Sequence, residues 1–558
     1  MRQYHSMAAQ PVQAEGHRFK TLFVTAQMVV GSLLVILLAF SPVATAATYV
    51  SGDIDEDTTW DEDGSPYIVT DSIHVLEDVT LKIDPGVTVK FNDDQKIVVD
   101  GLLYANGTAS DQVTFTSNNS SPQKGDWYTL RLRTEGNNIE HATIEYASYG
   151  IFMTYYGSNN TISNTTIQKS EIDGIYITNS DGNRLKDVTV KDNDRYGITV
   201  YQSDNTVINN ALVTGNNYFG INLNASKYTS ISNSNISSND GIGILFYSGS
   251  NHTVLDNVTL YNNQKQGLHL SGSGYNTINN SRVLENGDNG DLPGIDLGSS
   301  SSKYNNLGNL TVRNNHGHGL DLNGGDYNSV RDSTFQSNGG DGISSSNAGT
   351  VIRGGKFIDL ILDSNEGNGL RFDGRVLGST FLDLTATNNS GKGIYLSHGV
   401  SGLSSSIHSS FDDIVSSYNT EEGLEIALVG SEEPGYDDEI CVPREQTCDL
   451  TFANITTNYN GAAGFIFRPP RESDCEGSYC REDYFAWNRL SDITSSHNKG
   501  PGFMIDTRAE ECDNNTDDDC VDNWHQDISF DRNEFEDFTV SYNEKSGNDY
   551  DRRGYGFV

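Results

Sequence analysis

The stretch that decides the fold lies in residues 174–322, where one short motif occurs seven times. The copies read GIYI, GITV, GINL, GILF, GLHL, GIDL and GLDL, and successive copies start 23, 23, 23, 24, 27 and 25 residues apart. A fixed period of this length indicates that one supersecondary unit is repeated along the chain. The copies begin at Gly174, Gly197, Gly220, Gly243, Gly267, Gly294 and Gly319.

Each repeat contains three short apolar segments. In residues 174–190, Ile175 and Ile177 alternate with Tyr176 and Thr178, and two further apolar segments follow a polar break. Alternation with a period of two predicts strands with one face buried, and no sustained helical stripe follows residue 47. The sequence therefore predicts three strands per repeat.

Asn or Asp recurs between the second and third strands of the repeats, two residues after an apolar one. These residue types accept the left-handed backbone of a tight corner, and a buried Asn amide can bond the same residue one repeat away. We therefore expect a ladder of fourteen corner residues. They are Asn164, Asp187, Asn209, Asn233, Asn257, Asn280, Asn309, Asp332, Asp359, Asp383, Asp413, Asn454, Asp492 and Asp537.

The glycine that opens each first strand is expected to relax the corner before it. An Asn also recurs four or five residues before that glycine, at Asn193, Asn216, Asn239 and Asn262. Three strands and three corners per lap predict a solenoid whose coils lie about 4.8 Å apart.

This pattern resembles the right-handed parallel β-helix family, which includes pectate lyases, polygalacturonases, NosD-like surface proteins and many tailspikes. The resemblance covers roughly residues 75–558 and implies an all-β, single-stranded solenoid with coils of about 23 residues. We expect an N-terminal cap with irregular first coils over residues 47–135 and the β-helix over residues 136–558. Longer, disulfide-closed loops are expected in the C-terminal coils.

The N-terminus has the features of an export signal. Arg2, Arg18 and Lys20 precede an apolar segment, residues 28–40, and the small-residue sequence at residues 44–46 is typical of a cleavage site. We predict a signal peptide over residues 1–46, a secreted or cell-surface protein, and no stable membrane span after cleavage. An uncleaved anchor and a buried helix that caps the solenoid are the alternatives.

The chain is strongly acidic, with 76 Asp and Glu against 36 Lys and Arg and a net charge of −40. This charge argues against nucleic acid or an anionic membrane as a partner, and it favours cations or a high-salt habitat.

Three loop insertions, near residues 430–450, 469–487 and 507–530, contain all six cysteines. Locally spaced cysteines in an exported chain predict one loop-closing disulfide per insertion, with zinc as the alternative. The pairs are Cys441 with Cys448, Cys475 with Cys480, and Cys512 with Cys520.

The third insertion repeats oxygen ligands at alternate positions, as calcium loops do. Its spacing differs from that of an EF-hand, and a solvated acidic loop is the alternative. The predicted calcium ligands are Asp513, Asn515, Asp517 and Asp519.

The sequence ends inside a first strand, at residues 549–558. An uncovered parallel edge invites pairing with another chain. We therefore expect end-to-end self-association through this uncapped coil.

Outward positions of the first strands form a row along the solenoid. Asp296 and Asp321 fall at the same position of adjacent coils, which places their carboxylates roughly 5 Å apart. Such a pair can supply the acid and the base or nucleophile of glycosidic cleavage. His269 lies one coil before, and Arg371 and Asp373 lie two coils after. Solvated outward Asp residues are the alternative.

A short motif adds a resemblance to the Gly-His-Gly of polygalacturonases. Gly317, His318 and Gly319 carry it, which implies a catalytic role for His318. The chain departs from the family pattern, because its Asn-Thr-Asp, at Asn515–Asp517, and its Arg-x-Lys, at Arg184–Lys186, occur in the wrong order. A pectate-lyase chemistry with an Arg base and calcium would instead use Arg371 with Asp373.

Aromatic and amide side chains in the same rows suit a linear polysaccharide, because rings pack on sugar faces and amides match hydroxyls. The leading hypothesis is a polysaccharide-binding or structural module that recognises a cell-surface glycan. A polysaccharide-degrading hydrolase or lyase is the alternative, and assembly into an envelope layer or fibre is the third. The expected substrate-binding residues are Tyr176, Tyr201, Tyr247, His269, Asn323 and Asp373.

Overall fold

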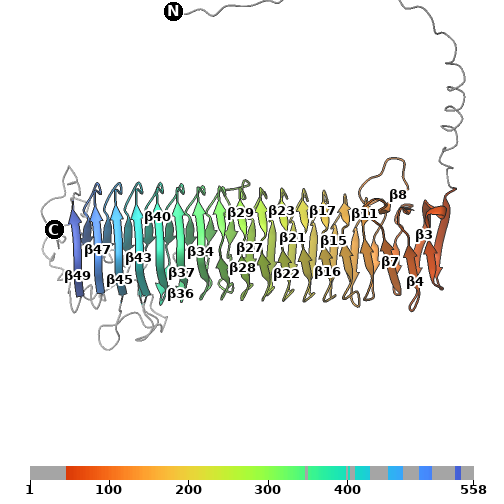
Figure 1. Ribbon diagram of the computed structural model, residues 1–558, viewed down its shortest axis with the longest axis horizontal. Helices are drawn as coiled ribbons and strands as arrows, with labels where there is room; N and C mark the ends of the chain where they lie inside the picture. Colours follow the sequence, from red (N-terminus) through yellow and green to blue (C-terminus); the bar gives the residue numbers. More distant parts are fainter. Residues whose placement is uncertain are drawn as a thin grey trace, which may run out of the picture. The chain divides into compact units, whose positions relative to one another are not determined.

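The computed structural model describes residues 46–345, 350–397, 400–401, 409–427, 450–468, 489–505 and 534–541. In these residues the chain winds into parallel coils that stack along one axis, from β3 (Tyr67–Val75) to β49 (Glu534–Ser541) (Figure 1). The only helix among them is a single 3₁₀ turn, η1 (Glu62–Gly64), and no helix of the described part could span a membrane. The predicted signal peptide lies almost wholly outside the described residues.

One coil consists of three strands, as predicted. β15 (Ile175–Thr178), β16 (Arg184–Lys186) and β17 (Thr189–Lys191) pair in parallel with their counterparts in the next coil. The first strands are β9 (Leu130–Leu132), β12 (Ile151–Thr154), β15, β18 (Ile198–Tyr201), β21 (Ile221–Asn224), β24 (Ile244–Tyr247), β27 (Leu268–Ser271), β30 (Ile295–Asp296), β33 (Leu320–Asp321), β35 (Ile343–Ser345), β38 (Leu370–Phe372), β41 (Ile394–Leu396), β44 (Leu424–Ala427), β46 (Phe465–Arg468) and β48 (Phe503–Ile505).

The second and third strands of each coil are separate up to residue 313. The second strands are β10 (Asn138–Glu140), β13 (Thr161–Ser163), β16, β19 (Val207–Asn209), β22 (Ser230–Ser232), β25 (Val254–Asp256), β28 (Thr277–Asn279) and β31 (Asn306–Gly308). The third strands are β11 (Ala142–Glu145), β14 (Thr166–Gln168), β17, β20 (Leu212–Thr214), β23 (Asn235–Ser237), β26 (Thr259–Tyr261), β29 (Arg282–Leu284) and β32 (Thr311–Arg313).

From residue 329 the second and third strands merge into one long strand per coil. These are β34 (Ser329–Gln336), β37 (Lys356–Asp363), β40 (Thr380–Thr387), β43 (Ser409–Ser417), β45 (Leu450–Asn458), β47 (Arg489–Ser496) and β49. A separate small sheet contains β36 (Val351–Arg353), β39 (Arg375–Leu377) and β42 (Val400–Ser401). The insertions with the six cysteines and the predicted calcium ligands lie outside the described residues.

The first coils differ from the later ones, because β3 pairs with β1, β5 and β6. Trp60 and Trp127 are both buried in these coils, and Trp127 stacks on Phe91 with ring centroids 4.0 Å apart. The strands of this part are β1 (Thr48–Ile54), β2 (Thr58–Trp60), β3, β4 (Thr80–Ile83), β5 (Thr88–Phe91), β6 (Ile97–Val99), β7 (Leu102–Asn106) and β8 (Val113–Ser117).

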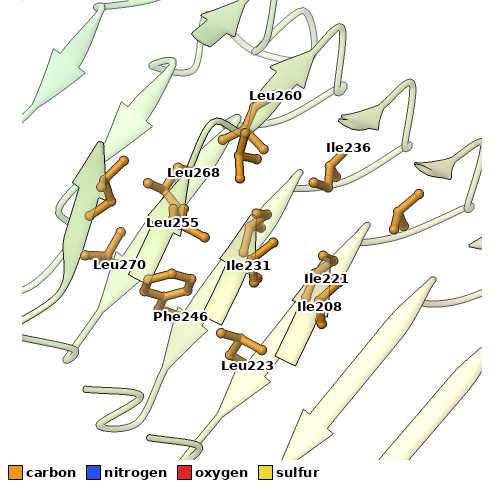
Figure 2. Close-up of a cluster of buried hydrophobic side chains, with 14 of the residues drawn as sticks. Ile208, Ile221, Leu223, Ile231, Ile236, Phe246, Leu255, Leu260, Leu268 and Leu270 are labelled. Atoms are coloured by element: carbon orange, nitrogen blue, oxygen red, sulfur yellow. The ribbon is translucent and has the colours of Figure 1, made fainter. Parts of the chain in front are cut away.

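The core is a set of aligned apolar columns inside the coils. Ile175, Ile198 and Ile221 pair in register and are fully buried, so the alternating pattern places one residue type at the same point of each lap. Figure 2 shows side chains such as Leu223 and Phe246 pointing from successive strands into this interior. Burial of apolar area at about 25 cal/mol per Å² is the main stabilising contribution.

The left-handed corners lie where the sequence placed them, with one exception. Thirteen of the fourteen predicted residues have φ between 49° and 55°, from Asn164 at 49° to Asp187 at 55°. The exception is Asn209, which ends strand β19, so that Asn210 adopts φ of 53° instead.

The position predicted for a buried amide ladder is wrong. The corner residues are largely solvent-facing, whereas the long buried ladder occupies the corner before the first strands from β18 to β48, where Asn216 Nδ2 donates to Asn239 Oδ1 at 2.9 Å. Eleven such side-chain bonds, 2.8 to 3.2 Å long, connect twelve residues. The members are Asn193, Asn216, Asn239, Asn263, Asn286, Asn315, Asn338, Asn365, Asn389, Asn419, Asn460 and Asn498.

Candidate functional site

Two columns of side chains run side by side along the first strands. The outward row follows the predicted register from β12 to β48, and Asp296 pairs directly with Asp321. Its members are Phe152, Tyr176, Thr199, Asn222, Leu245, His269, Asp296, Asp321, Ser344, Arg371, Tyr395, Glu425, Ile466 and Met504.

The second column consists of the residues that precede each strand-opening glycine. Backbone bonds between coils, such as Gly319 N to Asp341 O at 2.9 Å, keep this column in register. It changes from aromatic to polar along the chain, and its members include Tyr149, Asp173, Tyr196, Phe219, Gln266, His318, Asp341, Asn368 and Lys392. We call the two columns together the first-strand face.

An acidic site lies in the middle of this face, where Asp296, Asp321 and Asp341 are at most 8% exposed. One carboxylate oxygen of each is buried without a hydrogen-bond donor. Three adjacent carboxylates, each with one oxygen that lacks a donor, repel one another when all are ionised, so the site favours the retention of a proton.

Asp296 is held by its neighbours from the preceding coil. Its Oδ2 lies 3.0 Å from Nδ1 of His269 and accepts a hydrogen bond from Gln266 Nε2 at 3.2 Å. Gly298 leaves room for the imidazole, because a Cβ at this position would lie 3.0 Å from two ring atoms of His269. His269 therefore contacts the first of the two predicted catalytic carboxylates.

Asp321 retains a proton near neutral pH. Burial, followed by the negative charge of Asp296, raises its pKa to about 7, while a bond from Asn323 Nδ2 to Oδ2 at 2.8 Å acts in the opposite direction. The charge of Asp341 raises the pKa further. A carboxyl group in this state can donate a proton to a leaving oxygen.

His318 lies beside this pair and is fixed by a backbone contact. Its Nδ1 accepts a hydrogen bond from the N–H of Asp341 at 2.8 Å, and burial lowers its pKa. The Asp341 carboxylate also lies 3.5 Å from Nδ1. Because that nitrogen already accepts a proton from the backbone, the pair is not an ion pair, and the imidazole is neutral with its proton on Nε2.

Arg371 lies further along the same row and is bound by Asp373. Its Nε and Nη2 donate to the two carboxylate oxygens at 3.0 and 2.7 Å, and this bond raises its pKa. Its positive charge contributes to the lowered pKa of His318. Arg371 is thus near the acidic site, but the Nε–Nη2 edge of its guanidinium is occupied by Asp373.

The predicted aromatic contacts lie on the same first strands, toward the N-terminal end, with Tyr176 in the outward row and Tyr201 and Tyr247 two residues beyond that row. Tyr176 packs edge-on against Phe152 with ring centroids 5.1 Å apart, Tyr201 is half-buried, and Tyr247 is 48% exposed. Tyr176 is five coils from Asp296, so the structure places these residues along one line and not in one pocket.

Sequence reasoning missed Gln266, Asp341 and Asp173 because they belong to the corner column and not to a strand. Asp173 is fully buried, its carboxylate lies 3.2 Å from Nε of Arg195, and it accepts a bond from Thr199 Oγ1 at 2.8 Å. Burial raises its pKa to about 6. The signal that identifies such residues is their position directly before the repeated glycine.

A separate groove of about 560 Å³ lies along the long strands, between Asp383 and Thr494. Desolvation and the neighbouring charges of Asp359 and Asp413 raise the pKa of Asp383. Within the described residues, no three His, Cys, Asp or Glu side chains are arranged to hold a metal ion.

The sequence matches two family models. A family described as periplasmic copper-binding protein (NosD) matches residues 90–289, and one described as right handed beta helix region matches residues 219–376. The protein is a right-handed parallel β-helix. A segment of the chain is 33% identical over 70 residues to protein bark beetle of Drosophila melanogaster, which is 12% of the chain and 2% of that relative's length.

Solved structures with low identity to this β-helix are also known. The A-module of a mannuronan C-5 epimerase of Azotobacter vinelandii is 15% identical, with a TM-score of 0.31 over 52% of this chain and 86% of that one. A periplasmic alginate epimerase is 13% identical, with a TM-score of 0.29 over 74% and 81% of the chains. Pectate lyase Pel9A is 14% identical, with a TM-score of 0.28 over 62% and 71%.

Proposed function

We propose that this protein acts outside the cytoplasm and binds an extended polysaccharide along the first-strand face. The observation that carries the proposal is the single register line that joins Tyr176 to Asp296 and Asp321. A binding line with one position per coil, about 4.8 Å apart, suits a polymer of repeating units. Aromatic rings and amides along the line can contact sugar faces and hydroxyls.

Binding is tested by isothermal titration against a panel of soluble neutral, acidic and amino-sugar polysaccharides. We expect one class to bind the parent protein and Tyr176→Ala and Tyr247→Ala to weaken it roughly tenfold. Tyr261→Ala is the control, because Tyr261 lies on the third strand β26 and is 38% exposed. Equal affinity in the parent and both face variants would refute the proposed line.

Cleavage of the bound polysaccharide is a second candidate function, favoured by the pKa of about 7 at Asp321. Asp321 would protonate the leaving oxygen, and Asp296 would act as base or nucleophile, as paired carboxylates do in glycoside hydrolases. His318 would donate a hydrogen bond from Nε2. A lyase reaction would use Asp296 to abstract the proton next to a uronate carboxyl group and Asp321 to protonate the glycosidic oxygen that leaves as the C=C bond forms.

Cleavage is measured by release of reducing ends and by the ultraviolet absorbance of unsaturated products. We expect Asp296→Asn and Asp321→Asn each to lower the rate at least a hundredfold. Asp240→Asn, an exposed substitution with the same change of charge, should have no effect. Activity that survives both site substitutions would remove this function, whereas binding without turnover would leave the binding function alone.

A further inference from the structure

Five aromatic side chains form an exposed stack on another corner of the solenoid, between the first and second strands. We call it the tyrosine–histidine stack. Its neighbouring ring centroids are 4.8 to 5.3 Å apart, and its ring planes are within 21° of parallel. The members are Tyr228, His252, Tyr275, Tyr304 and Tyr327, one from each of five successive coils.

The backbone at these positions does not favour aromatic residues. All five have φ between 56° and 59°, a left-handed conformation that costs most side chains about 1 to 2 kcal/mol. Other coils fill the same corner with residues that tolerate it, namely Asn159, Gly182, Asn205, Gly354 and Gly378. Ring stacking of about 0.5 to 1.5 kcal/mol per pair offsets part of this cost. The backbone conformation therefore does not explain why aromatic residues occupy this corner.

The stack is solvent-facing over its whole length. Tyr228 and Tyr275 are each 53% exposed, Tyr304 is 44% exposed and Tyr327 is 41% exposed. Because each ring face covers the next ring, the stack presents ring edges and phenolic hydroxyls, with one hydroxyl in each tyrosine coil. Tyrosine is enriched at binding hot spots because it combines apolar area with a polar end.

The stack belongs to the same coils as the acidic site. Tyr275, Tyr304 and Tyr327 follow His269, Asp296 and Asp321 by a single corner in each coil. Tyr228 and His252 belong to the coils of Asn222 and Leu245. Each of these five coils thus carries one residue of the outward row and one ring of the stack. The two sets follow the same order along the axis.

We propose that the tyrosine–histidine stack is a second contact line for a linear, hydroxyl-rich polysaccharide, parallel to the first-strand face. This inference rests on the proposed polysaccharide binding. A polymer that lies along the axis meets a hydrogen-bonding group at each tyrosine coil. An apolar protein partner finds few ring faces there, because the stacked rings cover them.

The test replaces two rings by the residue that other coils use at this corner. Tyr275→Asn with Tyr304→Asn keeps the left-handed backbone, because Asn159 and Asn205 adopt it at the same position. The control is Tyr418→Asn with Tyr459→Asn, which removes a stack with centroids 4.9 Å apart on a different corner, where Asn314 and Asn388 adopt the same backbone. Titration with the polysaccharide that binds the parent protein, thermal unfolding and light scattering are measured for all three proteins.

We expect the double variant to bind about tenfold more weakly than the parent, and the control to bind like the parent. The inference is overturned if the double variant keeps the parent's affinity or if the control loses as much affinity as the double variant. It is also overturned if the only change is the loss of a dimer seen by light scattering. If Tyr176→Ala weakens binding while the double variant does not, the proposed function stands and the second line fails. If the parent binds no polysaccharide, both fail.

Discussion

The backbone N–H of Asp341 donates a hydrogen bond to Nδ1 of His318 across 2.8 Å. This bond joins two successive coils at the corner before the first strand, directly beside the acidic site. It leaves Nε2 as the only nitrogen of His318 that can donate a hydrogen bond, so the structural and chemical roles of the side chain rest on different atoms.

Two substitutions separate these roles. His318→Ala leaves the buried N–H of Asp341 without an acceptor, and we expect it to lower the free energy of unfolding by about 1 to 3 kcal/mol. His318→Asn offers a carbonyl oxygen close to the position of Nδ1, so it should restore stability. Polysaccharide turnover should be lost in both variants. Full turnover in His318→Asn would show that Nε2 has no part in the chemistry.

The raised pKa of Asp321 makes stability fall as pH rises. The folded protein binds a proton at this group between the ordinary carboxyl pKa, about 4, and about 7, whereas the unfolded chain does not. The free energy of unfolding therefore decreases across this window, by roughly 1.4 kcal/mol per unit of raised pKa. We expect Asp321→Asn to be more stable than the parent at pH 8, on the order of 4 kcal/mol, and equal to it at pH 4.

Denaturant unfolding at several pH values measures this difference. Asp240→Asn is again the control for net charge. If the free energy of unfolding changes with pH by the same slope in Asp321→Asn and in the parent, the assignment of the proton to this carboxyl group is contradicted. Asp173, with a pKa raised to about 6, contributes in the same direction and remains in both proteins.

Substitution of a buried-ladder asparagine should destabilise the protein more than substitution of an asparagine at a left-handed corner. Asn286 Oδ1 accepts bonds from the N–H and from Nδ2 of buried Asn263, both at 3.0 Å. Asn286→Ala leaves these donors without that acceptor, so we expect a loss of about 2 to 5 kcal/mol. Asn309→Gly changes a left-handed corner with φ of 51° and should cost less than about 1 kcal/mol. Hydrogen exchange of the neighbouring coils would locate both effects.

Gly298 should control the position of His269. In Gly298→Ala the new Cβ lies within 3.0 Å of the imidazole and 3.3 Å of Asp296 Oδ1, so the ring must move outward. We expect a longer contact than the present 3.0 Å between His269 and Asp296 and weaker polysaccharide binding. A crystal structure of the variant checks the distance. Gly308→Ala, in a second strand, is the matched control, and equal losses in both would indicate a general packing effect.

The third insertion, near residues 507–530, provides a prediction that rests on sequence alone. If Asp513, Asn515, Asp517 and Asp519 bind calcium, isothermal titration of chelator-treated protein should show one site. Asp513→Asn with Asp517→Asn should abolish that site without changing polysaccharide binding at the first-strand face. Unchanged calcium binding in the double variant would place the ion elsewhere.

Much of the fold could be predicted because the repeat is visible in the sequence. The period of 23 residues and the alternation around Ile175 fix the strands, the interior columns and the pairing of Asp296 with Asp321. The sequence pattern alone predicts the wrong corner for the buried amide ladder, because Asn recurs at more than one corner for different reasons. One corner requires a left-handed backbone, as at Asn164, and the other requires a buried amide, as at Asn216.

The candidate site was predicted only in part, because its chemistry depends on burial. Outward Asp residues on an acidic protein suggest solvated carboxylates, yet Asp321 is 8% exposed, and this burial raises its pKa. Asp341 could not be recognised from strand alternation, since it precedes a glycine in a corner. The link from His318 to Asp341 is a backbone bond, which sequence patterns do not encode.

The shared register of strands, ladder and stacks has a consequence for how such a protein changes over evolutionary time. Duplication of one whole coil adds a new step to each column at once and leaves the surrounding bonds intact, whereas a shorter insertion within a strand shifts every side chain beyond it. The length of the surface offered to a polymer can thus be altered in units of one lap, independently of the residues at its acidic centre.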